Sequence, residues 1–171
     1  MPETAQQYIQ RILSHADGRD GLALLAETPS RLESLLRDTL ADRWRKRPGP
    51  ERWSAGEILA HLADAEIVTG WRVRSILASD GFPLQPFDQD AWAEAFKYGE
   101  IDPAESLATF SGARASLLSL LRRVDPSRRQ HHGLHAERGK ESIEHLIQLY
   151  AGHDLNHLKQ IEALVADQPS M

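Results

Sequence analysis

Histidine is the residue type in this sequence that offers the most chemistry. The chain has eight histidines and no cysteine. Without cysteine there is no disulfide, no thiolate zinc site and no cysteine nucleophile. Three histidines, His131, His132 and His135, fall in one short run, and two more, His153 and His157, are four residues apart. A metal ion held by imidazole nitrogens is therefore the first hypothesis to develop.

His153 and His157 lie in a segment with a helical pattern of apolar residues. Ile147, Tyr150 and Ile161 fall close to the same stripe as His157. At about 100° per residue, His153 lies roughly 40° from His157 and one turn before it. Both rings therefore point towards the interior or its edge, where ring nitrogens four residues apart can reach one ion.

His61 is the natural third ligand, because a catalytic metal site typically uses three protein ligands and a water. Its neighbours on the helix face, Ile58 and Ala65, are apolar. A polar ring buried without a partner costs on the order of 1–3 kcal/mol, and a metal ion would supply that partner. The alternative stays open, since a single inward histidine is more often hydrogen-bonded than metal-bound and His-x-x-x-His pairs also arise by chance.

Five segments of helical periodicity must position these histidines. They are expected at residues 5–14, 28–48, 54–79, 102–124 and 141–167. Thr28 followed by Pro29 is a helix-start signal, and Ser54 with Glu57 matches a capping box. Four long helices with mostly short connections predict an all-α fold, a four-helix bundle with short additional helices.

Two connections are expected to be irregular. Residues 86–90 predict a loop, followed by one helical turn that contains Trp92 and Phe96. Residues 127–140 are polar and basic and predict a second loop, which holds the run of three histidines. A metal site there is disfavoured, because a flexible loop loses conformational entropy on ordering and no fourth group is evident. A solvated or structural loop is the preferred interpretation.

The bulk properties are those of an ordinary globular protein. The sequence of 171 residues, 41% apolar and 26% charged, fits a single domain (1–171) with a core at about 25–166. No apolar run approaches the roughly 20 residues needed to cross a bilayer, and the first residues lack a secretory pattern. A cytoplasmic protein without membrane contact is expected. The net charge of −5 argues against nucleic acid as the main partner.

Three segments carry a resemblance to a known family. They read WSAGEILAHLAD at residues 53–64, PFDQDAW at 86–92 and LYAGHDLNHLKQI at 149–161. In this order and spacing they make the chain resemble the DinB superfamily, and within it the YfiT-like branch of metal-dependent hydrolases and bacillithiol-type S-transferases. The resemblance extends over nearly the whole chain.

The resemblance implies a four-helix bundle in which His61, His153 and His157 hold a divalent ion of the zinc or nickel type. It also implies a homodimer and a small-molecule substrate. Relatives of this kind transfer a low-molecular-weight thiol such as bacillithiol or mycothiol, or isomerise with the help of a thiol, and others have only hydrolase names. Two positions depart from the YfiT-like pattern: Asn156 stands where relatives often have histidine, and Gly152 where they tend to have a bulky aromatic residue.

Five further residues are candidates for the site. Asp64 and Asp154, close in sequence to the ligands, could orient an imidazole or act as a base on bound water. Arg72 could hold an anionic substrate, and Tyr150 could border the site. Asp88 is a candidate to line the pocket on the strength of the resemblance alone. Each has an ordinary alternative: surface carboxylates, a salt-bridged arginine and a tyrosine packed in the core.

Two classes of function follow from a three-histidine site. In the first, neutral ligands leave the ion its full charge and open positions, so that a bound thiol is activated for transfer to a small electrophile or a bound water for hydrolysis. Both reactions use the same residues, and the resemblance favours thiol transfer. In the second, a non-catalytic bundle binds metal for stability or in a stress response. An open coordination position favours the enzyme, and a fourth protein ligand favours the structural site.

Overall fold

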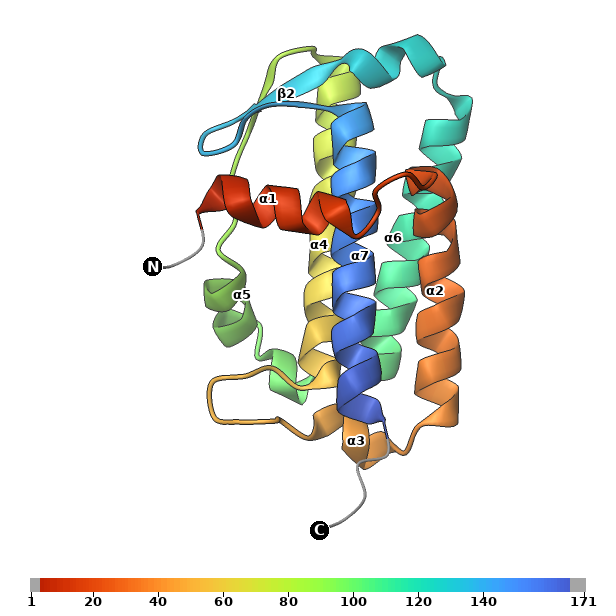
Figure 1. The fold of residues 1–171 in the computed structure, drawn as a ribbon, viewed down its shortest axis with the longest axis vertical. Coiled ribbons are helices and arrows are strands. Elements are labelled where there is room, and N and C mark those ends of the chain that lie inside the picture. The colour runs from red at the N-terminus through yellow and green to blue at the C-terminus, as the bar shows by residue number, and fades with distance from the viewer. Residues whose placement is uncertain (1–3, 167–171) are drawn as a thin grey trace.

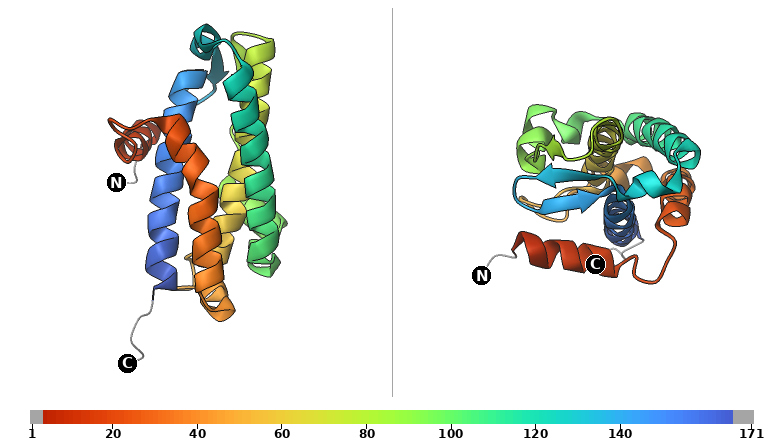
Figure 2. Two further views of the ribbon diagram at one scale, coloured as in Figure 1. Left: turned by 90° about the vertical axis from the view of Figure 1, so that its right-hand side faces the viewer. Right: turned by 90° about the horizontal axis from the view of Figure 1, so that it is seen from above.

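Four long helices pack side by side in the computed structural model, which describes residues 4–166 (Figures 1 and 2). They are α2 (Gly21–Asp38), α4 (Ala55–Ala78), α6 (Pro103–Arg123) and α7 (Ile143–Val165). Helices α4 and α6 run in the same direction, because the chain between them returns along the bundle before α6 begins (Figure 1). The predicted all-α bundle is confirmed. The predicted end of the last helix near Asp167 lies outside the described residues.

Three short α-helices and two 3₁₀ helices, Tyr98–Glu100 and Pro126–Gln130, complete the helical part among the described residues. The three short α-helices are α1 (Ala5–Ser14), α3 (Ala41–Arg45) and α5 (Gln89–Ala95). Helix α1 confirms the predicted segment 5–14, and α5 is the predicted turn, which begins after the N-cap residue Asp88. No helix in the described part of the chain is long and apolar enough to span a membrane.

Side-chain caps fix where the long helices begin. Ser54 and Glu57 form the predicted capping box at the start of α4, and Asp102 and Ser142 accept backbone N–H groups at the starts of α6 and α7. These contacts satisfy amides that have no partner within their own helix. Local sequence therefore predicts these three starts well.

The predicted start of α2 at Thr28 is wrong. The side chain of Asp20 accepts the N–H groups of Leu22 and Ala23, so that the helix begins at Gly21 and encloses Pro29. A proline inside a helix removes the hydrogen bond to the carbonyl four residues earlier, here that of Leu25. The predicted continuation to residue 48 is also wrong, because α2 ends at Asp38 and α3 follows.

The predicted loop 127–140 is wrong as well. Residues Pro126–Gln130 form a 3₁₀ helix, and β2 (His132–His135) pairs antiparallel with β3 (Gly139–Ser142). Strand β1 (Phe82–Leu84) adds a third strand, parallel to β2, with Phe82 opposite Gly133. The small sheet covers one end of the bundle beside α4 and α7 (Figure 1).

Gly152 and Asn156 of α7 both contact α1, which crosses α7 (Figure 1). A Cβ atom at Gly152 would lie 2.0 Å from the carbonyl oxygen of Ile12, so no larger residue fits beneath α1. One turn further along α7, the side-chain oxygen of Asn156 accepts a hydrogen bond from Arg11 at 3.4 Å. Both residues therefore take part in the packing of α1 against α7.

A buried polar layer divides the core. One apolar cluster contains Leu25, Val73 and Leu117, and the other contains Leu32 and Phe110. Between the two clusters lie buried polar and charged residues from all four long helices. They are Thr28, His61, Glu66, Arg114, His153 and Asp154.

Arg114 is the centre of this layer. Its guanidinium donates to Glu66 on α4 at 2.8 Å and to Asp154 on α7 at 2.7 Å. It also donates to the carbonyl oxygen of Leu25 on α2 at 2.7 Å, the acceptor that Pro29 leaves without a helical partner. One side chain of α6 thus joins all four long helices.

We expect Arg114→Met to lower the free energy of unfolding by about 3–5 kcal/mol, because it leaves two buried carboxylates without their counter-charge. Urea unfolding followed by circular dichroism measures the change. The control is Arg74→Met, since Arg74 lies exposed on α4 and, among the described residues, donates hydrogen bonds to Ser116 and to the backbone carbonyl of Gly70. Equal stability of the two variants would contradict the role given to Arg114.

Candidate metal centre

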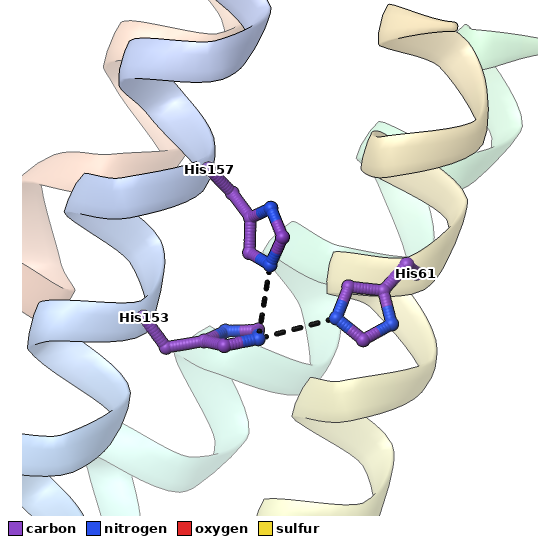
Figure 3. Close-up of side chains that lie close together, drawn as sticks. All are labelled: His61, His153 and His157. Atoms are coloured by element: carbon purple, nitrogen blue, oxygen red, sulfur yellow. Dashed lines mark hydrogen bonds between the residues drawn. The ribbon is translucent and has the colours of Figure 1, made fainter. Parts of the chain in front are cut away.

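Three histidine side chains converge between α4 and α7 (Figure 3). His61 comes from α4, and His153 and His157 come from successive turns of α7. The Nε2 atom of His153 lies 3.1 Å from Nε2 of His61 and 3.1 Å from Nε2 of His157. They are the one group of potential metal ligands of this kind found among the described residues. The three histidines selected from their spacing in the sequence therefore lie together in the fold.

Burial keeps these imidazoles neutral. His61 is 2% exposed and His153 is 8% exposed. Burial, with a smaller contribution from His157, lowers the pKa of His61 to about 3 and that of His153 well below its ordinary value. Burial also lowers the pKa of His157. At neutral pH each ring therefore has a nitrogen lone pair available for a ligand.

A hydrogen bond fixes the tautomer of His157. Its Nδ1 lies 2.8 Å from Oε1 of Gln160, an amide oxygen that can only accept. The proton of His157 is therefore on Nδ1, and Nε2 presents its lone pair to the other two histidines. Gln160 orients the ring in the way that outer residues orient metal-bound histidines.

The three histidines fit a divalent ion. Nitrogens bound at 2.0–2.1 Å in tetrahedral geometry are about 3.3 Å apart. Two of the separations here are 3.1 Å, and all three ligand atoms lie within 4.8 Å of one another. Without an ion, the three Nε2 atoms cannot all form good hydrogen bonds with one another, because each neutral Nε2 offers either one proton or one lone pair. Imidazole suits zinc, nickel, copper and iron.

The two predicted catalytic carboxylates are engaged elsewhere. Asp64 accepts a hydrogen bond from the hydroxyl of Tyr98 at 2.5 Å, and this contact together with burial raises the pKa of Tyr98. Asp154 is 2% exposed and is held by Arg114. Neither belongs to the ligand cluster, and their catalytic roles stay predictions.

The histidine cluster borders two cavities. One, of about 280 Å³, is lined by His61 and His153 together with Arg72 and Tyr150, two of the predicted substrate-binding residues. The other, of about 810 Å³, is lined by His157. Asp88, the third predicted substrate-binding residue, caps α5 and lines neither cavity.

Sequence reasoning missed several cavity residues. His135 and Arg138, from the β2–β3 hairpin, line the smaller cavity. Gln89 lines both cavities, and Trp53 lines the larger one with its ring 5.3 Å from that of His61. His135 and Arg138 were missed because residues 127–140 were predicted to form a loop and not a hairpin. The position of Trp53 could be predicted from the sequence, because it directly precedes the capping box at the start of α4.

Fold and site together define a helical-bundle protein with a candidate three-histidine metal centre. A family model described as the DinB superfamily matches residues 24–161, most of the chain. The chain belongs to the DinB superfamily. Helix α1 lies before the matched region.

Two curated relatives have the name "Putative metal-dependent hydrolase". OB0782 of Oceanobacillus iheyensis is 30% identical over 113 residues, which are 66% of this chain and 64% of that protein, just under two thirds of its length. YfiT of Bacillus subtilis is 25% identical over 146 residues, 84% of this chain and 81% of that protein.

The solved structure of Bacillus subtilis YfiT is similar in fold, with a TM-score of 0.75 at 20% identity over 84% of both chains. That protein is described as "a probable metal-dependent hydrolase with an unusual four-helix bundle topology". The TM-score shows that the two proteins share this fold.

We expect His61→Ala, His153→Ala or His157→Ala to reduce metal content by at least about tenfold, since each removes a ligand from a three-residue set. Elemental analysis of purified protein measures it. The control is His145→Ala, which changes a half-buried histidine of α7 outside the cluster. Full metal occupancy in His157→Ala would exclude the site.

Proposed function

We propose that this chain is a divalent-metal-dependent enzyme acting on a small molecule, with zinc or nickel held by His61, His153 and His157. The observation that carries the proposal is the position of three neutral histidines between two cavities. A purely structural ion would be enclosed by a fourth protein ligand. Among residues 4–166 the cluster offers three.

Each part of the chain has a distinct task in this proposal. The bound ion would supply Lewis-acid chemistry, lowering the pKa of a thiol or water that coordinates it. His157, oriented by Gln160, fixes one ligand direction. The apolar residues around the cluster exclude bulk water, and Arg72 and Tyr150 line the cavity in which a substrate would be bound.

Transfer of a low-molecular-weight thiol to a small electrophile is the preferred reaction. The resemblance to bacillithiol-type S-transferases supports it, and so do the two cavities, since thiol transfer needs room for two reactants. The thiol would give its proton to solvent, and its sulfur would bond to the electrophilic carbon while the leaving group departs with its electron pair. Hydrolysis is the second candidate and is favoured by the names of the curated relatives.

A comparison of metal-loaded and stripped protein, each with and without thiol, separates the candidates. We expect metal-dependent conjugation of bacillithiol, mycothiol or a surrogate thiol to an electrophile, with a loss of about a hundredfold or more in His61→Ala. Product formation is followed by mass spectrometry over a panel of electrophiles and esters.

The outcomes differ clearly. Metal-dependent turnover of an ester without thiol would replace S-transfer by hydrolysis. An absence of metal-dependent turnover, together with a fourth protein ligand on the ion, would favour the non-catalytic metal-binding bundle.

Self-association and a cytoplasmic location are further parts of the proposal. Ile67 and Trp71 are about half exposed one turn apart on α4, and the ring of Trp71 lies 5.5 Å from that of Phe82. Apolar side chains grouped on a surface in this way are typical of contact sites between proteins. A homodimer that covers this strip is expected.

We expect the wild-type chain of 19.2 kDa to sediment as a dimer at micromolar concentration. Trp71→Glu should shift it to the monomer, because a carboxylate would be buried at the contact. Phe96→Glu, at an exposed aromatic residue near α5, is the control. A monomeric wild-type protein would contradict the homodimer.

A further inference from the structure

Arg72 is a buried cation that has no carboxylate partner among the described residues. Its side chain is among the most buried in the protein, with 1% exposure, the same as Arg114. Arg114 is paired with two carboxylates. Within residues 4–166 the guanidinium of Arg72 donates only to neutral acceptors, the hydroxyl of Tyr150 at 3.1 Å and the carbonyl oxygen of Gln85 at 2.6 Å. Its Nε has no hydrogen-bond partner in the described part of the chain.

An unpaired buried charge is costly, and proteins normally pair such a group or bind an ion with it. Arg114 shows that this bundle can supply carboxylates to a buried arginine. At Arg72 it supplies none among the described residues, and Arg72 lines the smaller cavity. The missing negative charge is therefore one that a ligand in this cavity can bring.

His135 is a second donor without an acceptor at the same cavity. It is 4% exposed, and its Nδ1 accepts the backbone N–H groups of Glu137 and Arg138 at 3.2 and 3.3 Å. Because Nδ1 is the acceptor, the proton of the neutral ring is on Nε2. Burial, helped by Arg138, lowers the pKa of His135, and its Nε2 has no partner among residues 4–166.

Tyr150 adds a third donor. Its oxygen accepts from Arg72, and within the described residues its own hydroxyl proton has no acceptor. The other charged side chains at this cavity are Arg138, which is bound through two hydrogen bonds to Glu141, and the exposed Glu137 at the hairpin turn. Thus Arg72, His135 and Tyr150 offer hydrogen-bond donors to one cavity and leave one full positive charge uncompensated.

We propose that Arg72, His135 and Tyr150 form a carboxylate-binding subsite, and that the small molecule on which this protein acts has a carboxylate group at the end remote from the three histidines. The inference rests on the proposed small-molecule function and specifies its substrate class. A carboxylate has the single charge that Arg72 lacks and matches the planar guanidinium, whereas a phosphate monoester brings about −1.5 to −2.

The subsite is placed to orient a substrate. Arg72 follows His61 by three turns on α4 and lies on nearly the same face, with about 16 Å between their Cα atoms. Tyr150 lies between them, bonded to Arg72 and with its ring 5.9 Å from that of His153. A small elongated carboxylate held by Arg72 therefore extends along the cavity towards the histidines.

Thermal unfolding with butyrate, its neutral isostere butyramide and inorganic phosphate tests the subsite at constant ionic strength. A ligand that binds only the folded state raises Tm with its concentration. Metal-free protein is used first, so that coordination of the probe to an ion is excluded, and metal-loaded protein second. We expect butyrate to raise Tm in both forms and butyramide to have no effect.

Arg72→Met should weaken butyrate binding by about ten- to hundredfold, the effect of losing a charge-assisted hydrogen bond. Arg74→Met, an exposed arginine on the same helix, should leave it unchanged. Tyr150→Phe should weaken it by about two- to tenfold. If Arg72→Met does not fold, Tyr150→Phe decides, and unchanged butyrate affinity in that variant would overturn the proposal.

Several other results would also overturn it: no butyrate effect on wild-type protein, an equal effect of butyramide, an unchanged effect in folded Arg72→Met, or stabilisation by phosphate alone. The readout needs neither metal nor turnover. Failure of the metal-dependent function and failure of the carboxylate subsite are therefore separate outcomes.

Discussion

The position of one buried guanidinium determines how the helices of this protein meet. Arg114 binds a carboxylate on α4, a carboxylate on α7 and a backbone carbonyl on α2. A buried ion pair of this kind adds little net stability compared with an apolar core, but it strongly disfavours any arrangement that separates its members. Asp154 directly follows His153. The ion pairs of Arg114 with Glu66 and Asp154 therefore also fix the position of His153 along the bundle axis relative to α4.

The histidine cluster depends on that constraint. His61 and His153 belong to the same polar layer as Glu66 and Asp154, between two apolar clusters. Desolvation keeps the rings neutral. Their Nε2 atoms converge, and a bound ion fits this arrangement better than hydrogen bonds among the three rings do. On either side lies a cavity, and the smaller one holds Arg72, the buried cation that lacks a carboxylate. Arg114 pairs with two carboxylates and organises the fold, whereas Arg72 has no such partner among the described residues and is suited to bind a ligand.

Local patterns predicted the parts of the structure that depend on local physics. Residue spacing on helices selected His61, His153 and His157, and capping chemistry located the starts of α4 and α6. The start of α2 was wrong because Pro29 looked like an entry signal. Its missing hydrogen bond is instead compensated by Arg114, which is 85 residues away from it in sequence. Such a contact has no local signature. The hairpin with His135 was missed because its two strands are short and polar, and because β2 also pairs with the distant strand β1. The Arg114 cluster and the carboxylate subsite therefore needed the structure.

The central claim is that the three histidines hold one divalent ion and leave it open positions. X-ray absorption spectroscopy of protein loaded with zinc or nickel tests it most directly, because imidazole rings give a distinct multiple-scattering signal and ligand distances define the coordination number. The expected result is three imidazole nitrogens at about 2.0–2.1 Å with the remaining positions taken by solvent oxygen. A spectrum with fewer than three imidazoles, or with a fourth protein ligand closing the shell, would contradict the claim.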